Sequence, residues 1–173
     1  MHDNIKKRIN IAAKRQPADL VIKNCKIVNV FTHEIIEGDI AISDGKIAAV
    51  GNYSGEKEVD AEGRYALPGF INSHIHIESS FVSPEEFSRL VVPHGTTTII
   101  ADPHEIVNVC GMDGFDYMVK AGKNAALDIK YMIPSCVPCT PWEHAGAVVD
   151  SKAISEVINQ DKVFGMGEFM NTV

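Results

Sequence analysis

Apolar and polar residues alternate over most of the first third of the chain. Residues 19–30 and 38–51 are rich in Val and Ile and are interrupted by residues that favour turns. A period of two is typical of half-buried strands. Asp44 and Gly45, inside the second run, predict a tight hairpin turn between two strands. Residues 18–67 are therefore predicted to form a small antiparallel β unit.

The residues before this β unit follow a different period. Ile5, Ile9, Ala12 and Ala13 recur at helical spacing, so residues 1–17 are predicted to form a short amphipathic surface helix. The segment lacks the continuous apolar stretch of a secretory signal. A basic transit peptide is the alternative that its charges leave open.

From residue 68 onward, strand patterns alternate with helical ones. Strands are predicted at 70–77, 96–102, 128–135 and 163–168, and helices at 83–92, 114–122 and 151–159. Ser83 and Glu86 form a capping-box pattern around Pro84 at the first helix, and Asp113 is the expected cap of the second. This alternation indicates parallel βαβ units. Four such units are half of a (β/α)8 barrel, which takes about 250 residues, or a small open sheet.

Composition narrows the range of partners. The 173 residues carry a net charge of -7, whereas nucleic acids and anionic membranes attract clustered Lys and Arg. No apolar run approaches the ~20 residues of a membrane-spanning helix. Nothing indicates secretion, so the cysteines are expected to be reduced thiols; they are Cys25, Cys110, Cys136 and Cys139. We therefore expect a cytoplasmic protein without a nucleic-acid or membrane partner.

The strongest chemical signal lies in residues 68–80, PGFINSHIHIESS. Side chains on a strand point alternately to opposite faces, so His74 and His76 share one face. That face carries Phe70 and then the polar residues Asn72, His74, His76 and Glu78. The opposite face carries Ile71, Ile75 and Ile77, which would pack under helices. Two imidazoles at this spacing bind one divalent ion, or form a hydrogen-bonded pair without an ion.

Ionisable residues also follow the ends of other predicted strands. Asp102 and His104 come just after the second strand, and Glu168 ends the fourth. In β/α barrels the chemistry lies at the carboxyl ends of the strands, where packing does not require such residues. Because three of the four strand ends carry them, a metal site is predicted there. Glu143 and His144 follow the third strand and are weaker candidates for residues at the border of this metal site.

Several motifs together resemble the amidohydrolase superfamily and, within it, the adenine deaminase family. They are HIHIESS, PHGTTTIIADPHEIVNVCG, IPSCVPCTPWEHAGA and GMGEFMN, with a similar stretch at residues 18–51. This resemblance covers essentially the whole chain. It implies an α/β fold: the first half of a metal-dependent (β/α)8 TIM-like barrel in residues 68–173, preceded by part of a small β-sandwich domain in residues 18–67. The implied reaction is hydrolytic deamination of adenine to hypoxanthine and ammonia by a metal-activated hydroxide.

The resemblance also implies roles for individual residues. His74 and His76 would ligate one metal, and Glu168 would bridge a pair of divalent metals, manganese or iron, with zinc as the alternative. The catalytic candidates, which would contact the substrate or support the ligands through hydrogen bonds, are Glu78, Asp102 and His104. The implied partner is adenine, a small-molecule purine substrate. A homo-oligomer is expected for the full-length enzyme.

The sequence departs from the family pattern in one respect. The superfamily takes further histidines from the fifth and sixth strands and an aspartate from the eighth, and the 173 residues contain none of these strands. We therefore expect an N-terminal part of a longer enzyme, inactive alone. With two unpaired strand edges, it is also expected to aggregate.

Three alternatives remain open. The protein could act on another purine or a cyclic amide with the same metals, or be a non-catalytic interaction module derived from such an enzyme. The third is a zinc deaminase of another fold, which carries H-x-E followed by P-C-x-x-C. His76 and Glu78 precede Pro134, Cys136 and Cys139 in a similar order, but Pro134 does not directly precede Cys136, which counts against that alternative.

Overall fold

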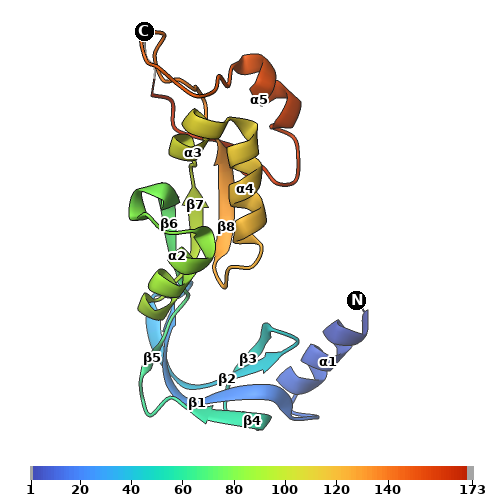
Figure 1. Cartoon of the computed structure of the whole chain (residues 1–173). Coiled ribbons are helices and arrows are strands. Elements are labelled where there is room, and N and C mark those ends of the chain that lie inside the picture. Colours follow the sequence, from blue (N-terminus) through green and yellow to red (C-terminus); the bar gives the residue numbers. More distant parts are fainter. Residues whose placement is uncertain (1, 171–173) are drawn as a thin grey trace. The chain divides into compact units, whose positions relative to one another are not determined.

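The computed structural model describes residues 2–170. The chain divides into two compact units, residues 1–68 and 69–173, and each is described here by itself (Figure 1). Among the described residues, none of the helices combines the length and the apolar character needed to span a bilayer.

The first unit is a five-stranded sheet with one helix. Its elements are α1 (His2–Ala12), β1 (Ala18–Asn29), β2 (Glu34–Ser43), β3 (Lys46–Gly51), β4 (Gly55–Asp60) and β5 (Tyr65–Ala66). The strand order is β3-β2-β1-β4, and β5 pairs with β1. The predicted hairpin is confirmed: β2 and β3 are antiparallel, and Asp44 and Gly45 both have the positive φ that a type I′ turn requires.

The pairing of the last two strands of this unit differs from the prediction. β4 and β5 run parallel to β1, so the sheet is mixed and not wholly antiparallel. Alternation of apolar and polar residues is the same whether a strand's neighbour is parallel or antiparallel. The pattern therefore predicts where the strands are but not the direction in which they pair.

Helix α1 forms inside the predicted segment but ends at Ala12, and it buries a different face. Ile5 and Ile9 are exposed, as are the two alanines that end the predicted stripe, whereas Ile11 is fully buried in a small cluster on the sheet. Lys7, one turn before Ile11 on the same side, pairs with Asp19 at 2.8 Å. The partly exposed ion pair lies beside Ile11, which packs against Ala18, Val21 and Ala41 of the sheet.

A buried carboxylate links β1, β2 and the segment after β3. Asp39 on β2 accepts hydrogen bonds from Lys23 Nζ at 2.5 Å and from the backbone N–H groups of Asn24 and Tyr53 at 3.1 and 3.2 Å. Burial acts to raise the pKa of Asp39, but the hydrogen bonds from Lys23 and the two amides outweigh it and lower the pKa below its ordinary value. The ionised carboxylate therefore stabilises the fold of this unit.

Replacing Asp39 by asparagine is expected to lower the free energy of unfolding by about 1–3 kcal/mol at neutral pH, because Lys23 loses its charged partner. Since the folded-state pKa is lowered, the carboxylate stabilises the protein above its unfolded-state pKa of about 3.9 and loses this effect as the pH falls through the folded-state pKa. The difference between the parent and Asp39→Asn is therefore expected to shrink below about pH 4.

Guanidinium unfolding at several pH values would measure this difference. The control is Glu56→Gln on the exposed strand β4, which is expected to change the unfolding free energy by less than about 0.5 kcal/mol. If Asp39→Asn lowered the free energy of unfolding by the same amount at neutral and at acid pH, the stabilisation would not come from the ionised Asp39 carboxylate.

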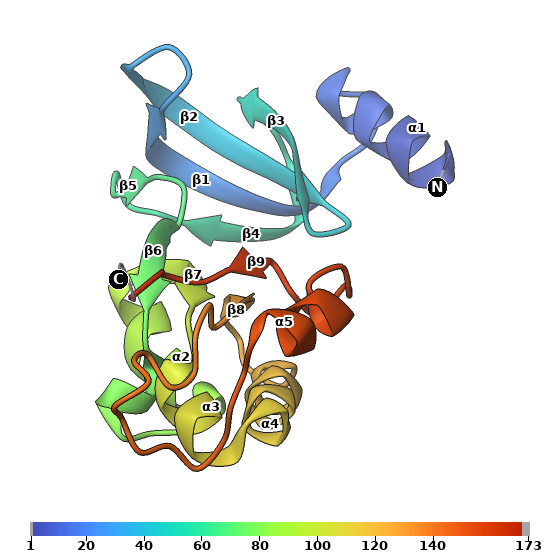
Figure 2. The same ribbon diagram turned by 90° about the horizontal axis from the view of Figure 1, so that it is seen from above.

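The second unit is a four-stranded parallel sheet in the order β6-β7-β8-β9. Its strands are β6 (Phe70–Ile75), β7 (Thr96–Ala101), β8 (Asp128–Ile133) and β9 (Gly165–Met166), and its α-helices are α2 (Pro84–Val91), α3 (His104–Cys110), α4 (Met112–Gly122) and α5 (Ser151–Val157). Short 3-10 turns occupy Ile77–Ser80 and Val92–His94. Helices α2, α3 and α4 lie on one side of the sheet (Figure 2). The predicted series of parallel βα units is confirmed.

The helices and their caps differ from the prediction in three places, although α2 begins at Pro84 after Ser83 as predicted. Helix α3 is an addition, because seven residues are too few to show a helical period. Helix α4 begins at Met112 with Gly111 as its cap, so the expected cap at Asp113 is wrong. At α2, the Ser83 hydroxyl accepts the Glu86 N–H, but the Glu86 carboxylate pairs with Arg89 at 2.8 Å. Half of the predicted capping box is therefore formed.

The first and fourth strands are shorter than predicted. β6 ends at Ile75 and a 3-10 turn follows, so Glu78 does not continue the strand. Ile77 is fully buried through that turn, but Ile71, predicted to pack under a helix, is exposed on the edge strand. The rule of alternating faces holds only while the backbone stays extended, which it does through His76 and not beyond.

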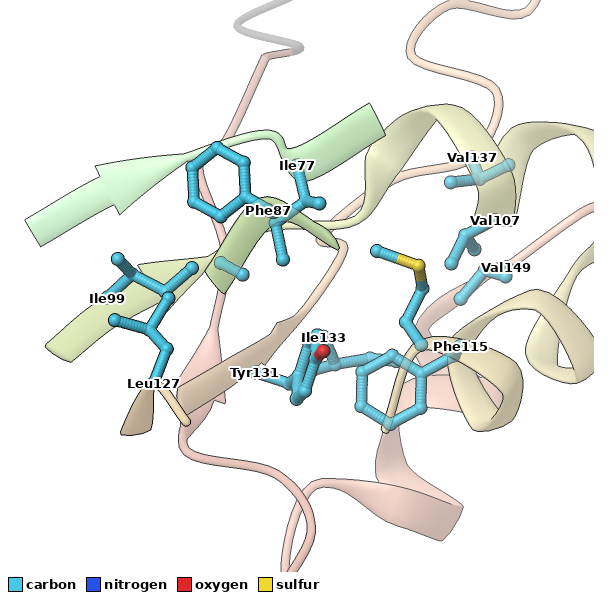
Figure 3. Packing of buried hydrophobic residues seen from close by; sticks show 12 residues of the cluster. Ile77, Phe87, Ile99, Val107, Phe115, Leu127, Tyr131, Ile133, Val137 and Val149 are labelled. Carbon is cyan, nitrogen blue, oxygen red and sulfur yellow. The ribbon is translucent and has the colours of Figure 1, made fainter. Parts of the chain in front are cut away.

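The core of the second unit lies between the sheet and its helices (Figure 3). Phe115 of α4 is fully buried, and its ring meets that of Tyr131 on β8 edge-on, with centroids 6.4 Å apart. Ile99 of β7 and Ile133 of β8 are also fully buried. This packing fixes the two central strands, whose carboxyl ends carry Asp102 and Ser135.

Candidate metal centre

Two imidazoles and one carboxylate converge at the carboxyl ends of β6 and β9. His74 is the penultimate residue of β6, His76 follows the strand, and Glu168 follows β9. The Nε2 atoms of the two histidines lie 3.2 Å apart. Glu168 Oε1 lies 3.1 Å from His76 Nε2, and Glu168 Oε2 lies 3.6 Å from His74 Nε2. One donor atom from each of the three residues lies within 4.8 Å of the others, which fits a divalent cation.

The donor set also suits a cation chemically. Neutral imidazole nitrogens and a carboxylate are ligands for zinc, iron and manganese. Two imidazole nitrogens that face each other beside an anionic oxygen are good hydrogen-bond partners only when one ring carries a suitably placed proton. A cation between them satisfies all three groups at once.

The backbone around Glu168 is held in place by two residues from neighbouring strands. The Glu168 N–H donates to Asp102 Oδ2 at 2.8 Å, and the Glu168 carbonyl accepts from the Ser135 hydroxyl at 2.5 Å. Gly167 permits this approach, because a Cβ there would overlap the Asp102 carboxylate. Glu168 is thereby positioned although β9 itself has only two residues.

His76 has a second acidic neighbour on its other ring nitrogen. Its Nδ1 lies 3.3 Å from Glu105 Oε2, and Ser79 donates to Oε1 of the same carboxylate at 2.9 Å. Burial acts to lower the pKa of His76, but the negative charges of Glu105 and Glu168 outweigh it and raise the pKa. A carboxylate on the far side of a histidine is the usual orienting partner of a metal ligand.

Asp102 and His104 form a second group with Glu168. One donor atom from each of these three residues also lies within 4.8 Å of the others. Asp102 follows β7 and is fully buried, and His104 starts α3 and is 7% exposed. The structure thus brings five predicted residues together around two groups that share Glu168.

Glu78 lies outside both groups. Its Oε1 accepts the backbone N–H of Ile106 at 3.2 Å, and burial raises the pKa of its carboxyl group. The sequence argument placed Glu78 with His74 by strand parity, which fails because β6 has already ended. A role for Glu78 beside the metal centre stays a prediction.

Residues outside the predicted set also contribute to the site. Ser135 holds the backbone of Glu168, Gly167 leaves room for its approach to Asp102, and Glu105 lies beside His76 Nδ1. Glu105 directly follows His104 in the sequence, which is the one signal that could have identified it. Gly167 and Ser135 act through backbone contacts that no residue pattern reveals.

The cysteines of the zinc-deaminase alternative do not take part. Among residues 2–170, no cysteine belongs to either potential ligand group. Cys136 and Cys139 instead line a hollow of about 400 Å³ with His104, Glu105 and Glu143. That alternative is therefore not supported by the geometry, whereas Glu143 does lie beside the site.

Sequence comparison identifies relatives of the whole described region. Residues 65–170 match the model of the Amidohydrolase family. The chain is 62% identical over 167 residues to adenine deaminase 2 of Desulfotalea psychrophila, covering 96% of this chain and 29% of that protein. It is 53% identical to adenine deaminase of Geobacillus kaustophilus, covering 99% of this chain and 30% of that protein. The chain thus spans about three tenths of the length of these relatives.

Two solved structures share this fold over most of the chain. A D-hydantoinase structure matches with a TM-score of 0.55 and 29% identity, over 69% of this chain and 28% of that one. Atrazine chlorohydrolase from Arthrobacter aurescens, solved in complex with zinc, matches with a TM-score of 0.59 and 18% identity, over 80% of this chain and 41% of that one. The second likeness concerns the fold alone.

Proposed function

The chain belongs to the amidohydrolase family, and we propose that it carries part of the active site of a metal-dependent adenine deaminase. The observation that carries this proposal is the convergence of His74, His76 and Glu168. The identity of 62% to a protein named adenine deaminase 2 favours adenine as the substrate. The proposed activity is that of a polypeptide of the relatives' full length.

The proposed chemistry assigns each residue a task. A divalent metal, when bound, supplies an activated water at neutral pH for attack on the purine ring. His74, His76 and Glu168 would hold the metal, and the Glu105 carboxylate places a negative charge 3.3 Å from His76 Nδ1. Manganese and iron are the proposed ions, with zinc as the alternative, because all three accept imidazole and carboxylate ligands.

The wider setting is also a proposal. We propose a cytoplasmic enzyme of purine metabolism that converts adenine to hypoxanthine and ammonia and forms a homo-oligomer. Neither nucleic acid nor membrane is proposed as a partner, because the net charge of -7 disfavours both.

A second candidate function has one observation in its favour. The D-hydantoinase likeness at 29% identity is compatible with a cyclic amide as substrate for the same metals. Adenine, guanine, hydantoin and dihydroorotate, assayed side by side, separate the two functions. Turnover of hydantoin in preference to adenine would contradict the deaminase proposal.

Metal removal is expected to abolish the activity. The purified polypeptide of the relatives' full length, stripped with a chelator and dialysed, is expected to produce no hypoxanthine from adenine, because the imidazole and carboxylate ligands alone supply no activated water. Manganese or iron(II) is expected to restore the rate, followed by the change in purine absorbance. Calcium is the matched control, because it prefers cages of oxygen ligands. Full activity in the stripped protein would show that the reaction needs no metal.

A further inference from the structure

A hollow of about 400 Å³ lies beside the proposed metal centre, between α3 and the segment that follows β8. Two of its lining residues adjoin that centre: His104 belongs to a group with Glu168, and Glu105 Oε2 lies 3.3 Å from His76 Nδ1. The other lining residues are Asn108, Cys136, Val137, Cys139, Glu143 and Met170. A small molecule in this hollow would therefore lie next to the metal centre.

The lining combines apolar surface with a few polar groups. Four of its residues, Val137, Met170 and the two cysteines, offer carbon and sulfur atoms that pack well against an aromatic ring. Away from the metal centre, the polar side chains are those of Asn108 and Glu143. Small-molecule sites have this composition, with a mostly apolar wall and a few placed polar groups. A flat heterocycle with polar edges is the class of ligand that fits it.

The Glu143 carboxylate is held beside the hollow by its own neighbours in the chain. The Thr140 hydroxyl donates to Glu143 Oε1 at 3.2 Å, and the Glu143 N–H donates to the Thr140 carbonyl at 3.2 Å. A hydrogen bond to the same carboxylate raises the pKa of the Cys139 thiol, which stays protonated as a donor. A carboxylate has about four acceptor positions. Two of them are used within this loop, so the others can accept a donor from a ligand.

Adenine as a free base presents a suitable donor. Its five-membered ring carries a hydrogen on N9, across the ring system from the amino group that the proposed reaction removes. A nucleoside has a sugar on N9 and no hydrogen to donate there. A site that hydrogen-bonds an N–H group rejects the analogue that lacks it, because the polar group of the site is then left unpaired. A carboxylate at this edge would therefore distinguish the free base from N9-substituted purines.

We propose that Glu143 accepts a hydrogen bond from the ring N–H of a free purine base bound in this hollow, and that it selects the free base over N9-substituted purines. Asn108 lines the same hollow, and its amide has donors and an acceptor for a second position on the ring edge. The inference rests on the proposed function, because it takes a purine as the ligand. It adds a residue that determines specificity and is not a metal ligand.

Kinetics with a matched pair of substrates test the contact. In the Mn²⁺-loaded polypeptide of the relatives' full length, kcat/KM is measured for adenine and for 9-methyladenine, which lacks the N9 hydrogen. We expect the parent to prefer adenine by more than about 10-fold, because the methylated base forfeits a charge-assisted hydrogen bond. Glu143→Ala is expected to lower kcat/KM for adenine by about 10–100-fold, mainly through KM, and to change that for 9-methyladenine by less than about threefold.

Product binding gives a readout that does not depend on turnover. Hypoxanthine keeps the N9 hydrogen, and its binding to the Mn²⁺-loaded protein is measured by equilibrium dialysis. We expect Glu143→Ala to weaken this binding by about 10–100-fold. Mn²⁺ binding is expected to stay parental, because Glu143 belongs to neither potential ligand group. The matched control is Glu156→Ala on α5, an exposed carboxylate that does not line the hollow, and it is expected to behave as the parent in both assays.

Thermal unfolding shows whether Glu143→Ala is folded. If it is not, Glu143→Gln takes its place, because its amide oxygen keeps the bond from Thr140 and lacks only the charge. Since charge-assisted hydrogen bonds are about twice as strong as neutral ones, the preference for adenine over 9-methyladenine is then expected to fall by about 3–10-fold.

Three results would overturn the inference. The first is a parent enzyme that deaminates adenine and 9-methyladenine equally well, and the second is a folded Glu143 variant that keeps the parental preference for adenine. In both cases the proposed deaminase would stand, and only the role of Glu143 would fall. The third is a parent that neither binds hypoxanthine nor deaminates adenine, which would contradict the proposed function together with the inference.

Discussion

In a polypeptide of the relatives' full length, replacing Glu168 by glutamine is expected to abolish the proposed adenine deamination and to weaken cation binding more than any other single change. The Glu168 carboxylate lies 3.1 Å from His76 Nε2 and 3.6 Å from His74 Nε2, and it belongs to the group of Asp102 and His104 as well. Loss of a hydrogen-bonding partner of a ligand costs about 10–100-fold in affinity or activity, so loss of a shared ligand is expected to cost more than about 100-fold.

Glutamine preserves the local structure at this position. It has nearly the shape of glutamate, and the backbone bonds of residue 168 to Asp102 and Ser135 do not involve the side chain. We therefore expect an unchanged thermal midpoint together with a loss of Mn²⁺ binding and of hypoxanthine formation. Glu156→Gln on α5, an exposed carboxylate outside both groups, is the matched control. Parental Mn²⁺ affinity in Glu168→Gln would show that Glu168 is not a ligand.

Gly167→Ala is expected to have the second-largest effect, although the change adds a single methyl group. A Cβ at this position would overlap the Asp102 carboxylate, which is fully buried and cannot swing away. The residue after β9 has to move, and the bond from the Glu168 N–H to Asp102 is then lost. We expect a loss of about 1–3 kcal/mol in the free energy of unfolding from overpacking, and about 10–100-fold in metal affinity.

Gly165→Ala is the matched control for this change. It adds the same methyl group two residues earlier, where the nearest atom is Met132 Cε at 3.1 Å. Because that atom is the end of a flexible side chain, we expect Gly165→Ala to remain close to the parent in stability and Mn²⁺ binding. Guanidinium unfolding and metal titration of both variants measure the difference. Equal unfolding free energies and Mn²⁺ affinities of the two alanine variants would show that the backbone at Gly167 does not approach the Asp102 carboxylate closely.

The sequence pattern predicts the parallel βα units and the tight hairpin well. Short runs rich in β-branched residues or in alternating apolar residues identify β7 and β8. The positive φ of Asp44 and Gly45 is what an Asp-Gly pair between strands predicts. The convergence of His74, His76 and Glu168 likewise agrees with a rule about strand ends, because parallel strands bring their carboxyl ends to one edge of the sheet.

Features that depend on contacts between distant residues are not predictable in this way. The buried face of α1 is the one on which Ile11 packs against the sheet, and the spacing of Ile5 and Ile9 does not identify it. Helix α3 is too short to show a period, and it carries His104 into the site from a helix start. The position of Glu78 was wrongly inferred because parity says nothing once a strand gives way to a 3-10 turn.

The shared position of Glu168 has a thermodynamic consequence for titration curves. If both groups hold cations, their occupancies are coupled, because the first ion fixes a carboxylate that the second also needs and adds a positive charge next to it. The association constant of the second cation then differs from that of the first by more than the statistical factor. It is higher if the fixed carboxylate dominates and lower if the added charge dominates. Linkage requires that each ion change the other's association constant by the same factor, so the order of loading cannot alter the total free energy of filling the pair.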